Sequence, residues 1–356
     1  MISRSRNLFA ADPIFAGVHG NLNIKKIETT MKRLFYLLFL AGLAACGNED
    51  EIIQEPTLQT VLVTKINSGS AETLTDISFG TKTTGYVCGS MGTLLKTIDG
   101  GTTWTKIQAG IQPSLNCIQA IDEKNVYTAR NELYQTKDGG TNWTTAGLGN
   151  TGSGIFDICF VNATSGFITK NGVMKSTDSG KTWTLVFDAG ADQEYYALNY
   201  NQIQFVNSSI GFCAGGKTYD GNSVGKIVKT TDGGNTWTSL KLKMSQVTAF
   251  HFLDTNTGFI FNFNQELWKT TDGGATWTKV SSSIPEKYPD CYFINASKVV
   301  LRTSKDLYHS MDGGVTWTKD YSLTDGSGLL TNMKFVDSRT GYLIGNNGFL
   351  AKITLN

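Results

Sequence analysis

Short runs rich in apolar and β-branched residues recur along most of this chain, separated by clusters of Gly, Asp, Asn, Ser and Thr. The first group contains four such runs, Thr75–Phe79, Gly85–Cys88, Thr93–Lys96 and Thr103–Ile107. Runs of this length and composition are typical of β-strands, and the separating residues are typical of tight turns. The pattern predicts a unit of four short strands, which we name A, B, C and D in chain order.

The same unit recurs along the chain with recognisable anchor residues. Strand A ends in an aromatic residue in all units but the second, which has Ala120 instead: Phe79, Phe160, Phe205, Phe252, Phe293 and Phe335. Strand B often starts with a glycine and an aromatic residue: Gly85-Tyr86, Gly166-Phe167, Gly211-Phe212, Gly258-Phe259 and Gly341-Tyr342. Six tryptophans after strand C are 39, 40, 54, 40 and 40 residues apart. A period near 40 indicates repeated supersecondary units.

A motif of the form Ser/Thr-x-Asp-x-Gly-x-Thr-Trp joins strands C and D in six units, with Asn142 in place of threonine in one copy. Its aspartates are Asp99, Asp138, Asp178, Asp232, Asp272 and Asp312. Its tryptophans are Trp104, Trp143, Trp183, Trp237, Trp277 and Trp317. Aspartate and hydroxyl side chains can bond nearby backbone groups, and glycine permits positive φ. The aspartates lie one per unit and lack the calcium-binding run Asp-x-Asp-x-Asp-Gly, so we interpret the motif as a structural turn.

These motifs resemble the Asp box of bacterial neuraminidase (BNR) repeats, found in sialidases, sortilin-type receptors, xyloglucanases and photosystem II assembly-factor-like propellers. The uniform copies are most similar to the assembly-factor-like propellers, across nearly all of residues 59–356. That resemblance implies a non-catalytic, exported scaffold that holds another protein. The arginine-rich surface of those relatives is not reproduced by Arg130, Arg302 and Arg339, so the resemblance does not imply a photosynthetic role.

The ends of the repeat region predict a closed ring. A seventh unit begins at Asn332 and ends at Ile353 without a strand D, and Val61–Ile66 resembles the strand D sequence of the first unit. We therefore predict an all-β fold at residues 59–356, a seven-bladed β-propeller of four-stranded blades in which an N-terminal strand completes blade seven. Closure removes exposed sheet edges. We also expect the propeller to be a monomer. An open solenoid is the structural alternative.

The N-terminal region carries a different signal. We interpret residues 1–30, which contain no repeat, as an over-extended start. Residues 31–45 combine a basic pair with the short apolar run Leu34–Ala45, as in a lipoprotein signal peptide, and the run is too short to cross a bilayer. Leu43-Ala44-Ala45-Cys46 resembles a lipobox, which implies lipidation of Cys46. Residues 46–58 then form an acidic tether, and the expected location is the bacterial envelope, on the periplasmic face of the outer membrane or at the cell surface. The alternative is a buried apolar segment of a cytosolic protein.

The net charge bears on nucleic acid binding, and the cysteine spacing bears on disulfide formation. Residues 1–45 hold six of 31 basic and two of 30 acidic residues, so the remaining chain has 25 and 28, a net charge of −3. A near-neutral chain offers no electrostatic case for nucleic acid binding. Besides Cys46, the five cysteines have irregular spacing, which favours buried free thiols and leaves one disulfide possible: Cys88, Cys117, Cys159, Cys213 and Cys291.

Catalytic and metal sites have little support in the sequence. The sialidase family has an arginine in an Arg-Ile-Pro motif, whereas this chain has Ser283-Ile284-Pro285. His251 and His309 lack metal-ligand spacing and are expected to be packing residues. We predict no catalytic residues, no metal and no cofactor. A carbohydrate-active hydrolase with paired carboxylates remains the alternative function.

A binding site is predicted where the period breaks. About 14 extra residues between Trp183 and Trp237 fall in residues 188–202, which join two blades, and in the B–C loop at residues 215–225. Both connections lie on the face opposite the Asp boxes, and loops on a rigid scaffold often carry binding residues. The predicted anchors for a protein or glycan partner are Tyr195, Tyr196, Tyr200 and Tyr219, with Asp192, Glu194 and Asp220 setting polarity. The simpler interpretation is a pair of ordinary long loops.

Overall fold

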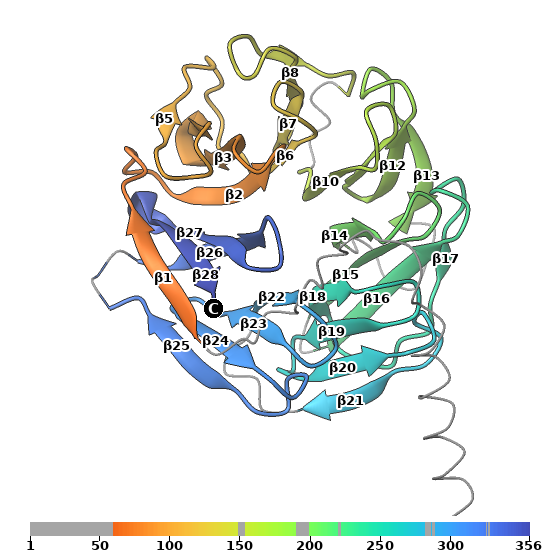
Figure 1. Ribbon diagram of the computed structural model, residues 1–356. Coiled ribbons are helices and arrows are strands. Elements are labelled where there is room, and N and C mark those ends of the chain that lie inside the picture. Colours follow the sequence, from red (N-terminus) through yellow and green to blue (C-terminus); the bar gives the residue numbers. More distant parts are fainter. Residues whose placement is uncertain are drawn as a thin grey trace, which may run out of the picture. The chain divides into compact units, whose positions relative to one another are not determined.

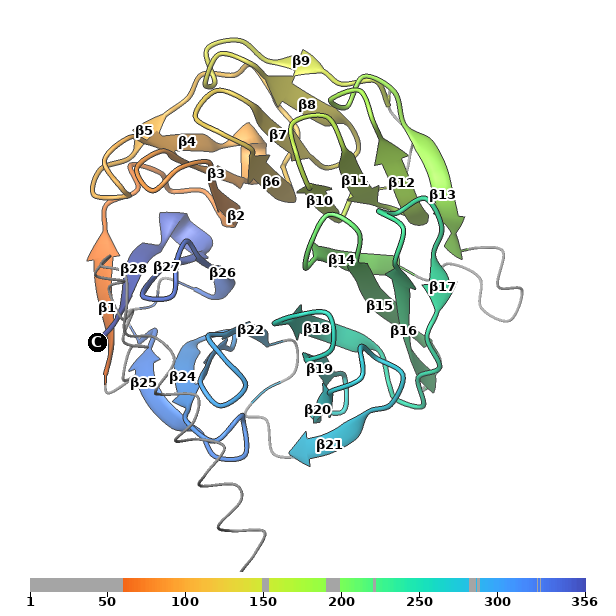
Figure 2. The ribbon, with the colours of Figure 1, turned by 45° about the vertical axis from the view of Figure 1, so that its right-hand side comes forward.

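The computed structural model describes residues 60–148, 154–189, 199–219, 222–281, 286, 289–324, 326 and 328–356. These residues belong to one compact unit, Glu55–Asn356. They form a ring of seven antiparallel sheets of four strands each, a seven-bladed β-propeller (Figures 1 and 2). The predicted fold class is confirmed.

In each blade the strands follow one another in chain order from the centre of the ring outward. Blade seven is the exception, because its outermost strand, β1, comes from the N-terminal end of the propeller. The blades are β2 (Leu74–Phe79), β3 (Gly85–Gly89), β4 (Leu94–Thr97), β5 (Thr105–Lys106); β6 (Cys117–Ala120), β7 (Val126–Ala129), β8 (Leu133–Thr136), β9 (Thr144–Thr145); β10 (Asp157–Phe160), β11 (Gly166–Thr169), β12 (Gly172–Ser176), β13 (Thr184–Asp188); β14 (Asn199–Phe205), β15 (Gly211–Tyr219), β16 (Asn222–Thr230), β17 (Thr238–Ser239); β18 (Val247–Phe252), β19 (Gly258–Asn262), β20 (Leu267–Thr270), β21 (Thr278–Ser281); β22 (Asp290–Phe293), β23 (Val299–Arg302), β24 (Asp306–Ser310), β25 (Thr318–Ser322); and β26 (Leu330–Phe335), β27 (Thr340–Gly345), β28 (Leu350–Leu355), β1 (Val61–Ile66). Short 3-10 turns, η1 (Ser90–Gly92) and η3 (Asn346–Gly348), join strands B and C in blades one and seven.

The N-terminal strand closes the ring as predicted. In Figure 1 the orange β1 lies beside the blue strands of blade seven. It pairs antiparallel with β28, in a register that runs from Val61 opposite Leu355 to Ile66 opposite Leu350. The outer edge of β28 is therefore paired, which removes an exposed strand edge from the ring.

The aromatic anchors form the seams between blades. Phe79 of blade one stacks on Tyr342 of blade seven with ring centroids 4.8 Å apart, and Trp104 meets Phe79 edge-on at 6.0 Å. The same stacking across a seam joins Phe160 to Tyr127, Phe205 to Phe167, Phe252 to Phe212 and Phe293 to Phe259. The Phe79 ring also covers Gly85, where a Cβ atom would lie 2.7 Å from the ring. The close approach of the Phe79 ring thus leaves no room for a side chain at Gly85.

Each Asp box closes its own turn. In the first copy, Asp99 accepts hydrogen bonds from the Thr103 backbone N–H (2.9 Å), the Thr97 hydroxyl (2.8 Å) and the Thr103 hydroxyl (2.6 Å). These bonds, those of the Thr103 side chain foremost, lower the pKa of Asp99 to about 2. Gly100 and Gly101 have φ of 66° and 79°, values that favour glycine. The Trp104 indole donates back to the Gly101 carbonyl at 3.1 Å.

Of the remaining sequence predictions, the one on the cysteines of the propeller concerns described residues, and those on the N-terminal region do not. The five cysteines of the propeller are free thiols; Cys88, Cys117 and Cys213 are buried, and the other two are partly buried. The proposals for residues 1–30, 31–45 and 46–58, including Cys46, lie outside the described residues. Within the part of the chain that is described, no helix is long and apolar enough to cross a membrane.

Candidate functional site

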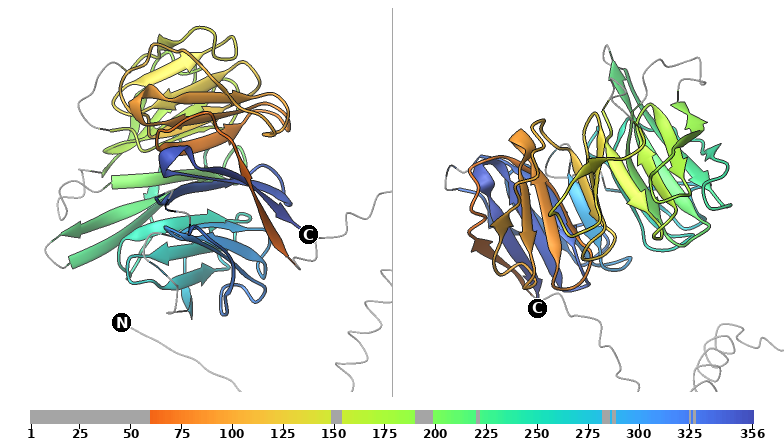
Figure 3. Two further views of the ribbon diagram at one scale, coloured as in Figure 1. Left: turned by 90° about the vertical axis from the view of Figure 1, so that its left-hand side faces the viewer. Right: turned by 90° about the horizontal axis from the view of Figure 1, so that it is seen from above.

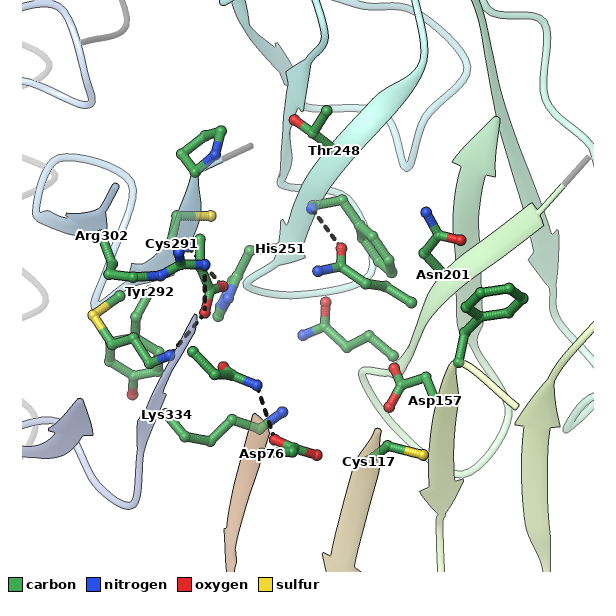
Figure 4. Close-up of a pocket in the computed structure, with 18 of the residues that line it drawn as sticks. Asp76, Cys117, Asp157, Asn201, Thr248, His251, Cys291, Tyr292, Arg302 and Lys334 are labelled. Carbon is green, nitrogen blue, oxygen red and sulfur yellow. Dashed lines mark hydrogen bonds and ion pairs between the residues drawn. The ribbon is translucent and has the colours of Figure 1, made fainter. Parts of the chain in front are cut away.

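A cavity of about 530 Å³ lies at the centre of the ring (Figure 4). Its lining extends along the innermost strands, from Asp157 and Asp290 at the starts of β10 and β22 to His251 and Lys334 near the ends of β18 and β26. Every blade contributes a side chain from strand A: Asp76, Cys117, Asp157, Gln202, His251, Asp290 and Lys334. The candidate site is therefore a property of the closed ring and not of one blade.

The three carboxylates of the cavity hold neighbouring blades together. Each accepts a hydrogen bond from the next backbone N–H in its own strand and another from the next blade. The bonds to the next blade come from Ile118 to Asp76 (2.9 Å), Ile203 to Asp157 (2.9 Å) and Met333 to Asp290 (3.1 Å). The corresponding bonds within the strand come from Ile77, Ile158 and Cys291. Both oxygens of each carboxylate are thus engaged in holding the fold.

Amide side chains also form hydrogen bonds between neighbouring blades. Gln119 accepts a bond from the Phe160 N–H (2.6 Å) and donates to its carbonyl (3.3 Å). Gln204 binds Phe252 in the same two-point manner at 2.8 and 2.9 Å. Where the ring closes, Asn332 donates to Asp76 at 3.0 Å. Most polar atoms of the cavity wall therefore have a structural partner.

Lys334 is an exception. Its side chain is exposed to the cavity, and it makes no hydrogen bond or ion pair with any residue that the structure describes. Its pKa is raised, chiefly by the Asp76 carboxylate, with Asp157 and Asp290 contributing. Burial raises the pKa of Asp76, and it raises that of Asp157 to about 6, against the opposing effect of Lys334. The cavity thus holds an ammonium group that is charged at neutral pH and available to a ligand.

Arg302 is the second cation of the cavity wall. Its Nη1 donates to the Leu330 carbonyl at 3.2 Å, and its Nη2 lies 4.0 Å from Asp290. Its buried Nε has no hydrogen-bond partner among the described residues. Three carboxylates and two cations, of which only Arg302 is held by hydrogen bonds, make the cavity polar.

The two histidines have different surroundings. His251 meets Tyr292 edge-on at 5.6 Å, and burial lowers its pKa to about 4, so it is neutral at pH 7. His309 bonds Asp320 at 2.8 Å. It occupies the position at which Lys96 donates to an Asp-box carbonyl of the next blade, and blade seven has no Asp box to receive such a bond. No metal-binding group of His, Cys, Asp or Glu occurs among the described residues.

The predicted rim site is only partly described. Tyr200 differs from the expectation of an exposed anchor: it is 2% exposed and meets Phe187 edge-on at 5.7 Å, because its ring fills the core between blades three and four. Tyr219 is the last residue of β15, and its side chain is not among the described ones. The other predicted residues lie outside the described part of the chain: Asp192, Glu194, Tyr195, Tyr196 and Asp220.

The second insertion extends a pair of strands where the sequence predicted a loop. β15 and β16 pair without interruption from Gly211 opposite Thr230 to Tyr219 opposite Asn222. Each is nine residues long, whereas most strands B and C have four or five. The resulting hairpin projects beyond the ring (Figure 3). The sequence analysis placed the B–C loop at residues 215–225, yet these residues continue the ladder as far as Tyr219 opposite Asn222.

The cavity carboxylates were also missed, although the sequence contains a signal for them. Asp76, Asp157 and Asp290 each stand three residues before a strand A phenylalanine. Side chains alternate along a strand, so this position and the one before phenylalanine both face the channel. Aligning the repeats on phenylalanine would have grouped these residues.

Comparisons with known proteins find a resemblance to photosystem II assembly factors. A family model described as Photosynthesis system II assembly factor YCF48 matches residues 56–154. A structure of YCF48 bound to D1 peptide matches with a TM-score of 0.65 and 17% identity over 83% of this chain and 97% of the other. The chain is a BNR-type β-propeller that resembles the photosystem II assembly factors.

Other structures share the propeller. YCF48 from Cyanidioschyzon merolae matches with a TM-score of 0.66 and 17% identity, over 82% of this chain and 98% of that protein. A GH74 xyloglucanase from Xanthomonas campestris matches with a TM-score of 0.55 and 10% identity, over 80% of this chain and 59% of the enzyme. At such identities the likeness concerns the BNR-type fold alone. No curated protein sequence matches the chain.

Proposed function

We propose that this chain is a non-catalytic lipoprotein of the bacterial envelope, anchored through Cys46, whose propeller holds a segment of another protein. The observation that carries the proposal is the central cavity, in which the carboxylates are engaged by backbone N–H groups while the Lys334 ammonium makes no hydrogen bond or ion pair with the described residues. The resemblance to YCF48, which has been observed with a D1 peptide, supports a protein segment as ligand.

The size and polarity of the cavity agree with this proposal. About 530 Å³ is a typical volume for a small-ligand pocket and accommodates a few side chains, not a folded domain. A peptide can offer a carboxylate or carbonyl oxygen to Lys334. The β15–β16 hairpin of blade four extends toward the face opposite the Asp boxes, and tyrosines at or near it would enlarge the contact area. In this proposal the partner contacts both the cavity and the predicted rim site.

A hydrolase is the second candidate, because Asp157 has a pKa near neutrality, as a general acid needs. Its two oxygens, however, already accept N–H bonds from Ile158 and Ile203. Rotating the carboxylate toward a substrate would leave a buried N–H without a partner at the seam between blades three and four. A glycan could still bind without being hydrolysed, and a glycoside-hydrolysis screen of the purified protein tests the enzymatic alternative.

Cross-linked capture from the native envelope tests the binding proposal. Lys334→Ala should reduce recovery of the partner, since it removes the unpaired ammonium, while Lys137→Ala on the Asp-box face should not. Circular dichroism and melting temperature verify the fold of both variants. Equal recovery by the wild type and Lys334→Ala would show that the cavity does not hold the partner.

Lipid anchoring has its own test. Growth with a fatty-acid analogue should label the wild type and leave Cys46→Ser unlabelled. A wild-type protein that never acquires the label would remove the lipoprotein part of the proposal.

A further inference from the structure

We propose that the Asp-box face of blades six, seven and one rests on the lipid bilayer to which the chain is anchored. This inference rests on the proposed anchoring at Cys46, and it concerns a different surface from the binding cavity. It is carried by where the propeller chain begins and by the side chains that surround that point.

The propeller begins at the Asp-box face. Val61 pairs with Leu355 at the end of β28, and Thr60 exchanges backbone hydrogen bonds with Asn356 at 3.3 and 3.1 Å. The Leu355 N–H donates to the carbonyl of Arg339, which lies in the turn between strands A and B of blade seven. In every blade this turn and the end of strand C share one face, the face of the Asp boxes. The tether therefore joins the ring at this face, on blade seven.

Exposed apolar side chains gather on the blades around this point. The residue between Ser/Thr and Asp of the box is Ile98 in blade one and Met311 in blade six, which are 71% and 45% exposed. Blades two to five have polar residues there: Lys137, Thr177, Thr231 and Thr271. Val315 in the box of blade six and Leu62 near the start of β1 are each 54% exposed. Four large apolar side chains thus face solvent on three consecutive blades.

Elsewhere on the described surface, large exposed apolar side chains do not form such a group. The other large exposed apolar residues there are Met91 and Leu329 at the opposite face and Leu185, the second residue of the outer strand in blade three. Lys82 and Arg339 are exposed in the A–B turns of blades one and seven, beside the apolar group. Carboxylates share this face, Asp99 and Asp312 in the boxes and Asp337 beside Arg339, so the exposed apolar side chains and not the net charge favour contact with a bilayer.

The tether alone does not decide which face meets the membrane. Residues 46–59 number 14 and could extend about 50 Å, more than the rise of about 17 Å along a five-residue strand. An extended tether could therefore reach around the edge of the ring. The apolar group is what favours one orientation, by leaving water when that face meets lipid.

The test attaches residues 47–356, which lack Cys46, to vesicles through a hexahistidine tag at the N-terminus and nickel-chelating lipid, so it does not depend on acylation. The vesicles contain phosphatidylcholine, a minority of phosphatidylglycerol and a nitroxide-labelled lipid. A fluorophore is placed on a new cysteine by Met311→Cys, with Thr177→Cys as the matched position in blade three and Asn264→Cys at the opposite face. The parent protein, with no new cysteine, measures background labelling.

The expected result is quenching that is several-fold stronger at position 311 than at positions 177 and 264. Equal quenching at the three positions would overturn the inference. In a second measurement, Ile98→Thr together with Val315→Thr, both threonines being common in the other boxes, should reduce the excess at position 311. Persistence of the full excess would show that the apolar group does not set the orientation. Absence of acylation at Cys46 in cells would remove the lipoprotein proposal and leave this measurement unchanged.

Discussion

At the scale of single residues, the Asp box is a set of hydrogen bonds whose strength depends on an ionised aspartate. Asp99 accepts bonds from two hydroxyls and one N–H, and its carboxylate is surrounded by donors. The sequence was sufficient to predict this turn, because aspartate, glycine and threonine at fixed spacing have a local meaning. The sequence could not reveal that the second glycine also makes room for a neighbour: a Cβ on Gly101 would lie 2.4 Å from the Tyr342 hydroxyl of blade seven.

We expect Asp99→Asn to lower the melting temperature at pH 7, with the deficit shrinking in acid. The folded pKa of about 2 lies below the unfolded value of about 3.9. The charge therefore stabilises the fold above pH 4, and this contribution is lost as the pH falls toward 2. Thermal melts of both proteins from pH 7 to pH 2 measure the effect. A deficit that is independent of pH would mean that the shape of the side chain matters and its charge does not.

The Asp-box tryptophans should contribute differently to the free energy of unfolding, although they occupy the same position in the motif. Trp237 is buried and meets Phe167 at 6.2 Å and Phe205 at 5.9 Å, one ring on each side of a blade seam. Trp237→Ala should cost about 3–5 kcal/mol of unfolding free energy, as for other large buried side chains. The matched control is Trp143→Ala, since blade two has Ala120 in place of a stacking phenylalanine. Denaturant unfolding of both variants makes the comparison, and equal losses would contradict the role assigned to the stacked rings.

At the scale of elements, the sequence predicted β1 at its observed residues because it has the composition of strand D and blade seven lacked one. The long β15–β16 hairpin was not predicted, since local composition cannot show whether two strands stay paired past a glycine. Gly216 has a φ of 147°, which a glycine can adopt without ending the ladder. Periodicity therefore indicates that strands exist more reliably than it indicates where they end.

Deleting Val61–Ile66 should lower the melting temperature and promote aggregation. The deletion exposes the N–H and C=O groups of β28 that now pair with β1, and an unpaired edge can pair with another molecule. Leu62→Ser is the control, because that side chain is exposed and the backbone pairing remains. Differential scanning calorimetry and light scattering follow the two effects. An unchanged melting temperature in the deletion variant would contradict closure by this strand.

At the scale of the whole molecule, the central cavity exists only when the ring is closed, and this is why single stretches of sequence did not disclose it. Its wall brings together Asp76 and Lys334, which are 258 positions apart in the numbering. The count and order of the blades could be predicted from the period. The contacts across seams could not, because each depends on which side chain of one blade meets which backbone group of the next.

Partner binding can be divided between the rim around blade four and the central cavity by comparing variants of each. Tyr196→Ala with Tyr219→Ala should weaken partner recovery if the rim around blade four contributes buried aromatic anchors, which are often worth about 2 kcal/mol or more each. Tyr200→Ala serves as the contrast, since its ring is buried and its loss should lower stability first. Cross-linked capture and circular dichroism report the two effects separately. Full recovery by a folded rim variant, together with loss of recovery in Lys334→Ala, would assign the partner to the central cavity alone.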